Sequence, residues 1–514
     1  MVRKLLPILA ACLLLILLLI VTRRFWTGNY LNFSDGAKFA DVARNIASGN
    51  GYSSNFSNFT SKALGFENLV SVSRWTKPVM PLVIAGFLKI FGVSDSSVIA
   101  TSSLFYLLLV LTTYFLGKKL WGKLVGLLGA ISVAFNFNFL EYALSGASET
   151  LFAFEIVLGA FLFALKKRWA NILGFLVLVL IYFTRAQGII YIFGLTLLFF
   201  LLHFQPKKAL GYFLAFFVVG SFLYLFVSKQ GLFAITQHLP GQAASNALRG
   251  AVQETNMIAL FKKVFYNLYN FYKLLPQIVS PYMWAIFIIG LFVWSKNKIE
   301  NYLKLSTIFM VVVTFLVTAL TIPFFRYLHP VVPLIYLFAT ASLVWVVKKI
   351  FSKSKTMAIV SSLLIFIFVV GQSLGVIFLD SRFKAKTINK GKPPVYVALS
   401  RILKENTNPD DIIVTNLDTW GSWYGERKTI WYPLEPKQLE GLDDEVDAIY
   451  LTSYLIDDEN YYMGPEWRQV FFNPDKIEGS FILENYILAG EFEISPEETY
   501  ERQGARAILL VRNQ

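Results

Sequence analysis

The sequence has very few of the residues that bind metals or form disulfides. Its one cysteine, Cys12, lies in an apolar run, so neither an intrachain disulfide nor a cysteine-based zinc site can form. The three histidines, His203, His238 and His329, lie in different segments, which argues against a histidine cluster. The sequence also has no Walker motif and no dinucleotide-binding fingerprint, so we predict no nucleotide-binding domain.

Acidic residues are scarce in the first 379 positions. This part has 9 Asp and Glu against 32 Lys and Arg, whereas the remaining 135 residues have 24 acidic and 15 basic residues. The basic excess lies in short loops between apolar runs, where it indicates membrane topology and not nucleic-acid binding. We therefore expect no nucleic acid among the partners of this protein.

Long apolar runs dominate the same part of the chain. Hydrophobic residues make up 56% of the sequence and the mean hydropathy is +0.56, which is typical of a polytopic membrane protein. We predict eleven spans, near residues 5–22, 95–116, 122–140, 148–165, 169–184, 188–204, 209–227, 278–294, 303–321, 329–347 and 356–379. The first run could instead be a cleaved signal peptide, but it lacks a small-residue cleavage site, so we treat it as a retained helix.

The positive-inside rule gives this topology an orientation. With a cytoplasmic N-terminus, the loop after the second span and every second loop after it are cytoplasmic. Each of these loops carries lysine or arginine. The loops 23–94 and 228–277 are then external, as is everything after residue 379, and 78–92 is predicted to be a short interfacial helix. We expect a multi-pass cell-membrane protein in contact with membrane lipids, with its C-terminal domain outside the cytoplasm.

Residues 380–514 have a different pattern. Segments 411–415 and 505–511 read as buried strands, and 395–405 has the apolar spacing of a helix. The predicted fold is thus an all-α membrane domain over 1–379, followed by an extracytoplasmic α/β domain over 380–514.

The stretch 34–52 follows the first span and contains the most informative acidic residue. Ser34 is a candidate N-cap, apolar residues recur at helical spacing up to Ile46, and Gly49 can end the helix. Asp35 would then lie in the first turn, close to the lipid headgroups. The alternative is that Asp35 only complements the helix N-terminus, an effect of under about 1 kcal/mol.

Other charged residues are predicted at the same depth. Glu149 starts the fourth span, and four cations come from distant segments of the chain: Arg74, Lys77, Arg185 and Arg326. Arginine can hold a phosphate in a bidentate fork, so together these cations would suit a lipid phosphate. Each one taken alone is also typical of a cation that extends to the membrane interface without a further role.

These residues occur in an order that resembles the GT-C superfamily of membrane glycosyltransferases, in particular the branch of the protein O-mannosyltransferases and lipid A aminoarabinose transferases. The similar motifs are Ser34-Asp35-Gly36, Lys77-Pro78-Val79-Met80-Pro81, Ser148-Glu149-Thr150, Thr184-Arg185-Ala186-Gln187-Gly188 and Phe325-Arg326-Tyr327. Two positions depart from the pattern, since Gly36 replaces a second acid and Ala186-Gln187 replaces Pro-Glu.

The resemblance implies an enzyme of GT-C-like fold that transfers a sugar from a polyprenyl-phosphate donor to a hydroxyl of a lipid, glycan or protein acceptor. It implies Asp35 as the general base and Glu149 as a second catalytic carboxylate. The donor phosphate would be bound by Arg74, Lys77, Arg185, Arg326 and Tyr327. No metal ligand is assigned, and a divalent cation remains an open alternative.

Two further matters remain open at the level of sequence. Trp423 and Tyr424 lie in an aromatic-rich segment of the outer domain and are candidates for stacking on an acceptor sugar, although core packing is the more ordinary use of such residues. A transporter or flippase of lipid-linked sugars, or a non-catalytic protein that binds envelope glycans, would also need a basic external pocket.

Overall fold

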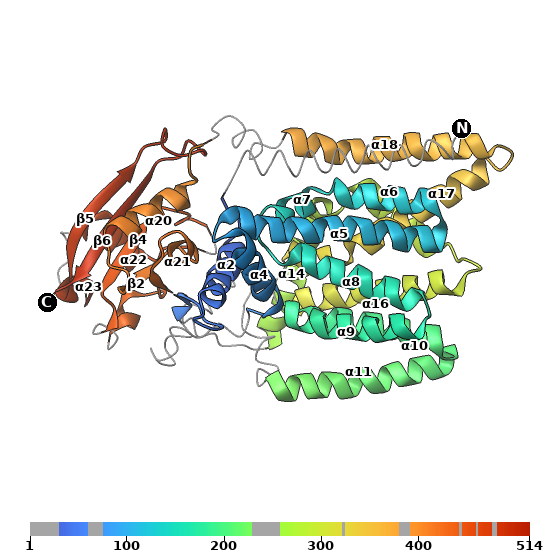
Figure 1. Ribbon diagram of the computed structural model, residues 1–514, viewed down its shortest axis with the longest axis horizontal. Helices are drawn as coiled ribbons and strands as arrows, with labels where there is room; N and C mark the ends of the chain where they lie inside the picture. The colour runs from blue at the N-terminus through green and yellow to red at the C-terminus, as the bar shows by residue number, and fades with distance from the viewer. Residues whose placement is uncertain are drawn as a thin grey trace.

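The computed structural model describes residues 30–59, 76–228, 257–320, 324–379, 391–440, 445–458, 461–474 and 481–513. The molecule is elongated and has two parts, a bundle of roughly parallel helices and a C-terminal domain built on a sheet (Figure 1). Helices α2 (Ser34–Ala47) and α4 (Val79–Phe91) lie between them. The described residues that precede α5 thus lie at the junction of the two parts.

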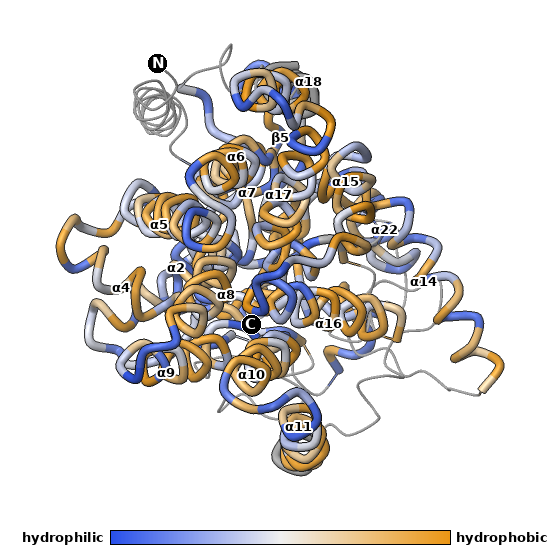
Figure 2. The backbone as a smooth tube through the Cα atoms, turned by 90° about the vertical axis from the view of Figure 1, so that its right-hand side faces the viewer, coloured by the Kyte–Doolittle hydropathy of each residue, from blue (hydrophilic) through white to orange (hydrophobic). Residues whose placement is uncertain are grey.

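The bundle consists of long apolar helices. Within the described residues, four helices are long and apolar enough to cross a membrane, and two bent pairs would raise the number to six. Figure 2 shows the hydrophobic character of the bundle end-on. Its helices are α5 (Asp95–Trp121), α6 (Lys123–Ala134), α7 (Phe137–Ala143), α8 (Glu149–Ala164), α9 (Arg168–Thr184), α10 (Gly188–His203), α11 (Pro206–Ser228), α14 (Met257–Ile278), α15 (Pro281–Leu291), α16 (Lys298–Leu320), α17 (Val332–Ile350) and α18 (Lys355–Leu379).

The protein is therefore a multi-pass membrane protein, but the expected number of eleven spans is not confirmed. The span predicted over 5–22 lies outside the described residues. The span predicted over 122–140 is a bent pair, α6 and α7, which meet at 64°. The span predicted over 278–294 was wrong in its bounds, because α15 has only 11 residues and is joined at 104° to α14, a helix within the predicted external loop.

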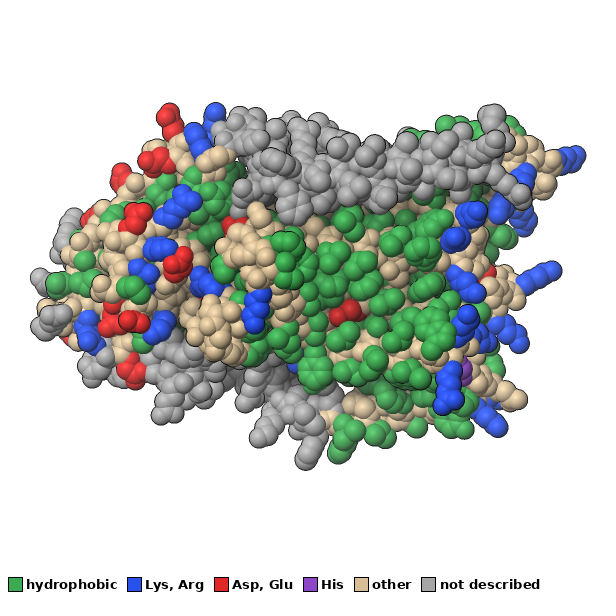
Figure 3. Space-filling view, viewed as in Figure 1, with side chains coloured by type: hydrophobic (Ala, Val, Ile, Leu, Met, Phe, Trp, Pro, Cys, Tyr) green, Lys and Arg blue, Asp and Glu red, His purple; other side chains and the backbone are tan. Residues whose placement is uncertain are grey.

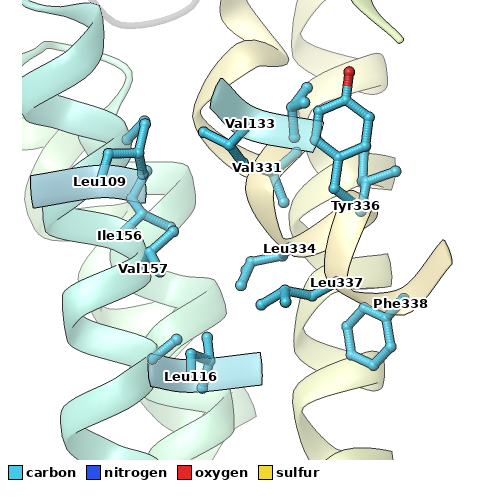
Figure 4. Close-up of a cluster of buried hydrophobic side chains, with 14 of the residues drawn as sticks. Leu109, Leu116, Val133, Ile156, Val157, Val331, Leu334, Tyr336, Leu337 and Phe338 are labelled. Atoms are coloured by element: carbon cyan, nitrogen blue, oxygen red, sulfur yellow. The ribbon is translucent and has the colours of Figure 1, made fainter. Parts of the chain in front are cut away.

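A close-packed apolar core holds the bundle together. Figure 4 shows Leu334 and Leu337 of α17 in this core, with Leu109 of α5 and Ile156 of α8 among its other members. All four side chains are fully buried. Because a packed interior resists the loss of even one methylene group, this core gives the helix ends at the domain junction fixed positions.

Helix α2 forms as the sequence predicts, with one difference at its start. The N-cap residue is Phe33 and not Ser34, and no side chain caps the helix. Asp35 therefore supplies the first-turn negative charge that complements the exposed N–H groups. Helix α4 confirms the predicted short helix, which begins after Pro78 and ends at Gly92 with a positive φ of 85°.

The C-terminal domain is built on a six-stranded mixed sheet in the order β1-β3-β2-β4-β6-β5. Strands β1 to β4 are parallel where they pair, and β6 is antiparallel to both β4 and β5. The strands are β1 (Phe56–Ser57), β2 (Ile412–Thr415), β3 (Lys428–Trp431), β4 (Ala448–Thr452), β5 (Tyr486–Ile494) and β6 (Ala505–Arg512). The short helices around it are α20 (Val395–Glu405), α21 (Trp420–Trp423), α22 (Pro465–Phe472) and α23 (Phe481–Asn485). The predicted strands β2 and β6 and the predicted helix α20 are confirmed.

Strand β1 comes from the segment between α2 and α4, far from the rest of the sheet in sequence. Its two residues pair in parallel with Thr429 and Ile430 of β3. Helix α2 contacts α21, because Arg44 donates hydrogen bonds to the carbonyl oxygens of Ser422 and Trp423. The same guanidinium is paired at 2.8 Å with Asp41, which is completely buried. The outer domain is therefore fixed to α2 by both backbone and side-chain bonds.

The charged side chains are distributed unevenly along the molecule. In Figure 3, lysines and arginines gather at the end of the bundle farthest from the C-terminal domain, whereas acidic side chains are concentrated on that domain. A broad hydrophobic band separates the two regions. This distribution matches a membrane protein with one basic end and one large domain on the opposite side.

Candidate functional site

The site is built around an ion pair between two residues that are 291 positions apart in the sequence. Asp35, in the first turn of α2, lies 2.6 Å from Nη1 of Arg326. Arg326 belongs to the 3-10 helix η2 (Phe325–Tyr327), which leads through a second short helix, η3 (His329–Val331), into α17. Both side chains are partly exposed, at 31% for Asp35 and 28% for Arg326.

A second ion pair lies next to the first. Glu149, at the start of α8, has Oε1 2.7 Å from Nη1 of Arg185 and 3.8 Å from Nη1 of Arg326. Arg185 follows the last residue of α9 in an extended conformation and also donates to the hydroxyl of Ser148. Two carboxylates and two guanidiniums thus form a continuous chain, Asp35, Arg326, Glu149 and Arg185.

Burial gives Glu149 a special position in this chain. Its side chain is 1% exposed, and neither of its carboxylate oxygens accepts a well-directed hydrogen bond from the described residues. Among the described residues, the two arginines compensate its charge.

The arginines also determine the charge state of Asp35. Burial raises the pKa of its carboxyl, but the positive charges of Arg326, Arg185 and Lys38 outweigh this effect and lower the pKa to about 2. Asp35 is thus ionised throughout the neutral range. A carboxylate with so low a pKa is a poor base, unless Arg326 moves away from it.

Aromatic residues hold η2 and η3 against the bundle. The hydroxyl of Tyr191, on α10, donates to the carbonyl oxygen of Tyr327 at 2.6 Å, and the hydroxyl of Tyr142 lies 3.0 Å from Nδ1 of His329. His329 is fully buried, between the rings of Phe139 and Tyr142. These contacts hold the segment that directly follows Arg326 in place.

Arg326 lies near both carboxylates of the site. Nη1 of Arg326 lies between carboxylate oxygens of Asp35 and Glu149, which is the place that a cation bridging the two would take. Within the described ranges, no group of three or more His, Cys, Asp or Glu side chains gathers in a way that suits a metal ion. The guanidinium supplies the positive charge that these two carboxylates need.

The structure brings together five of the residues singled out in the sequence: Asp35, Glu149, Arg185, Arg326 and Tyr327. The ammonium of Lys77 lies 4.8 Å from the ring centroid of Tyr182 on α9, so its role in binding the donor phosphate stays a prediction. Arg74 lies outside the described residues.

Trp423 and Tyr424 contact α5 through their polar atoms. The indole N–H of Trp423 and the hydroxyl of Tyr424 both donate to the carboxylate of Asp95, at 2.7 and 2.8 Å. The Tyr424 hydroxyl accepts a further hydrogen bond from the N–H of Leu31. Their polar atoms are thus used to dock the outer domain on α5, which is the packing role that the sequence left open as the alternative to binding an acceptor.

Two residues at the site were not predicted. Lys38 lies one turn after Asp35 on α2, and Asp418 lies in the loop after β2. Their charges interact with each other and with Asp35. The spacing of three residues from Asp35 could have identified Lys38, and the carboxyl end of a parallel strand could have drawn attention to Asp418.

No family model matches this sequence, and no curated protein matches it. The fold, however, is similar to that of solved membrane enzymes. ArnT from Cupriavidus metallidurans, bound to undecaprenyl phosphate, has a TM-score of 0.52 at 10% identity, over 98% of this chain and 97% of that one. The Archaeoglobus fulgidus oligosaccharyltransferase in complex with Zn and sulfate has a TM-score of 0.56 at 13% identity, over 95% and 72%.

The same archaeal enzyme, AglB, in complex with an inhibitory peptide and a dolichol-phosphate has a TM-score of 0.54 at 14% identity, over 95% of this chain and 73% of that one. ArnT and AglB are both GT-C superfamily members. At this level of identity the comparison shows the fold, and the chain has the GT-C fold over nearly its whole length.

Proposed function

We propose that this GT-C-fold protein is a glycosyltransferase that moves a sugar from a polyprenyl-phosphate donor to an acceptor hydroxyl. The observation that carries this proposal is the chain of ion pairs in which Arg326 and Arg185 compensate Asp35 and Glu149. Two partly or fully buried arginines whose counter-ions are protein carboxylates can exchange one of them for a phosphate. The fold neighbours crystallised with undecaprenyl phosphate or dolichol-phosphate support a lipid phosphate as that ligand.

The exchange would also activate the base. When the donor phosphate binds to Arg326, the guanidinium leaves Asp35, and the pKa of Asp35 rises because its main compensating charge is gone. Asp35 then takes the proton of the acceptor hydroxyl as the acceptor oxygen bonds to the anomeric carbon. In the same step the bond from that carbon to the phosphate oxygen breaks, and its electron pair remains on the phosphate.

The arginines and Glu149 would stabilise opposite charges in this step. Arg326 and Arg185 compensate the second negative charge that develops on the departing phosphate. Glu149 lies beside them with its carboxylate oxygens free of hydrogen bonds, and it would stabilise the positive charge on the sugar ring in an oxocarbenium-like transition state. We assign no step to a metal, because Arg326 occupies the bridging position between the two carboxylates.

The orientation of the protein follows from the charge distribution. We place the basic end of the bundle in the cytoplasm, and the site and the outer domain on the opposite face of the membrane. The donor would then be consumed outside the cytoplasm, which explains why the site is built from external loops and helix ends. The acceptor is an outer-face lipid, glycan or protein that carries a hydroxyl.

The test uses purified full-length protein in nanodiscs, a panel of radiolabelled polyprenyl-phosphate sugars and a membrane-extract acceptor pool. We expect the label to leave the polyprenyl phosphate and to appear in a product that separates from the polyprenyl carrier by chromatography. Movement of intact labelled lipid between leaflets of proteoliposomes, without loss of the sugar, would identify a flippase and overturn the proposal. Binding without either reaction would identify a non-catalytic protein.

A further inference from the structure

The cations of the site differ in how strongly they are already paired. Arg326 and Arg185 each lie within 2.7 Å of a carboxylate oxygen. Lys38, by contrast, makes no hydrogen bond and no ion pair within 4.0 Å among the described residues, although its charge interacts with Asp35, Asp418 and Arg326. Lys38 is therefore the cation of this cluster that can accept an anionic ligand without first breaking a contact.

Asp418 is the outer domain's contribution to this region. It follows strand β2 and adopts a positive φ of 54°, a conformation that aspartate and asparagine tolerate better than most residues. Its carboxylate accepts hydrogen bonds from the N–H of Thr419 at 2.7 Å and from the hydroxyl of Tyr461 at 2.9 Å. The side chain is 9% exposed, so its charge is fixed in place.

The loop that carries Asp418 is attached to the start of α2. The hydroxyl of Thr419 donates to the carbonyl oxygen of Ser34 at 2.8 Å, one residue before Asp35. The distance between Asp418 and the first turn of α2 is thus set by a direct bond between the two parts of the protein. Lys38 lies on the next turn of α2, and its charge interacts with those of both Asp35 and Asp418.

We propose that Lys38 is a phosphate-binding residue of the site and that Asp418 is the positioning residue that holds its ammonium toward the ligand. This inference rests on the proposed function and adds to it a third cation and a direct role for the outer domain. An ammonium is a compact charge on a flexible stem, so it needs a fixed counter-charge to have a defined position. Asp418 supplies that charge from a rigid loop.

Asp418 also favours the charged form of the lysine. Burial lowers the pKa of Lys38, and Asp35 and Asp418 oppose this shift while Arg326 adds to it. When the donor phosphate draws Arg326 toward itself, the charge of Asp418 continues to act on Lys38. The site then keeps one cation beside the phosphate that does not depend on the movement of an arginine.

The experiment measures binding of undecaprenyl phosphate to the full-length protein in nanodiscs, together with KM and kcat for the donor and the acceptor. We expect K38M to weaken binding by about tenfold or more and to raise the KM of the donor more than it lowers kcat. K38R keeps the charge and should stay within about threefold of the native protein. D418N preserves shape and tolerates the positive φ, and should weaken binding by about threefold.

A double variant separates positioning from general loss of structure. If Asp418 acts through Lys38, then K38M/D418N binds no worse than K38M, whereas two independent contributions would multiply. Lys404, which forms an exposed ion pair with Glu426 in the outer domain, gives the matched control K404M, and this variant should bind as the native protein does.

The outcomes also distinguish the sources of the phosphate. A higher KM for the donor assigns the ligand to the donor lipid, and a higher KM only for a phosphorylated acceptor assigns it to the acceptor; both support Lys38 as a phosphate ligand. Native binding and native KM values in K38M overturn the inference and leave the proposed function intact. Failure of the native protein to bind undecaprenyl phosphate or to transfer a sugar overturns both.

Discussion

Gly36 packs against the backbone of Ser145, in the turn between α7 and α8. A Cβ atom at position 36 would lie 1.9 Å from the carbonyl oxygen of Ser145, a distance that no side chain can occupy. Asp35 can therefore reach the ion-pair chain only because the next residue has no side chain. The close approach also explains why a second acid is absent at this position.

The first prediction concerns this contact. We expect G36A to destabilise the protein by about 1–3 kcal/mol or more, because the atom that it meets is backbone and cannot rotate away. Transfer should fall with it, since Asp35 and α8 are pushed apart. Thermal unfolding in detergent and the transfer assay measure the two effects.

The matched control is G86A, on α4. Nothing lies within 4 Å of a Cβ atom at Gly86, and helix interiors favour alanine over glycine by roughly 0.5–1 kcal/mol. Stability should be unchanged or slightly higher in this variant. Equal effects of G36A and G86A would contradict the packing explanation.

The second prediction separates binding from chemistry at Asp35. We expect D35N to lower kcat by about 10²- to 10⁴-fold, because an amide cannot take the acceptor proton. The same variant should bind undecaprenyl phosphate at least as tightly as the native protein, since Arg326 no longer has to leave a carboxylate. A parallel loss of binding and turnover would argue against the exchange of counter-ions.

The third prediction tests the arginine itself. We expect R326M to weaken undecaprenyl phosphate binding by about tenfold or more, because it removes a charge-assisted contact to phosphate. R326K keeps the charge but not the planar fork, and should fall between R326M and the native protein. Isothermal titration in nanodiscs can rank the three proteins. An affinity of R326M equal to the native value would exclude Arg326 as a phosphate ligand.

The fourth prediction is a pH dependence with a definite sign. The pKa of Asp35 is lowered to about 2 in the free protein, so its base form is present well below neutral pH. The acid side of the kcat/KM profile, which reports the free enzyme, should therefore be flat from pH 8 down to about 5. In the complex Arg326 is on the phosphate and the pKa of Asp35 is higher, so kcat should begin to fall at a higher pH than kcat/KM. Coincident acid limbs would contradict this order.

The fifth prediction concerns divalent cations. Because Arg326 bridges Asp35 and Glu149, we expect transfer to persist in excess EDTA, within about twofold of its value in Mg²⁺. R326M removes the cation that lies closest to Asp35 and within 3.8 Å of Glu149, and Mg²⁺ or Mn²⁺ should then partly restore its activity. A complete loss of native activity in EDTA, reversed by one of these ions, would show that a metal and not the guanidinium serves the site.

The sequence was a good guide where local pattern and structure coincide. The amphipathic spacing of 395–405 and the apolar run ending at Thr415 depend on near neighbours, and both elements formed as expected. The common depth of Asp35, Glu149, Arg185 and Arg326 followed from the alternation of spans and loops, which needs no knowledge of tertiary contacts.

Features that depend on contacts distant in sequence could not be predicted. Helix α14 lies in what reads as a loop, and its sharp bend into α15 has no strong local signal beyond Pro276 and Pro281. The sequence could not show that the indole N–H of Trp423 donates to Asp95, which is 328 positions away. Asp418 likewise acquires its place at the site through Thr419 and Ser34, from opposite ends of the chain.

Strand β1 has a consequence for the order in which the protein matures. Residues 56–57 are synthesised early, but their partners at 429–430 follow only after the last helix of the bundle. The pairing of β1 with β3 can therefore form only after nearly the entire polypeptide has been synthesised. Pairing between strands so distant in sequence is also slow to form. A chain truncated before residue 429 would therefore lack both the partner of β1 and the Thr419-bearing loop's final setting beside α2, so this junction is complete only when synthesis is nearly finished.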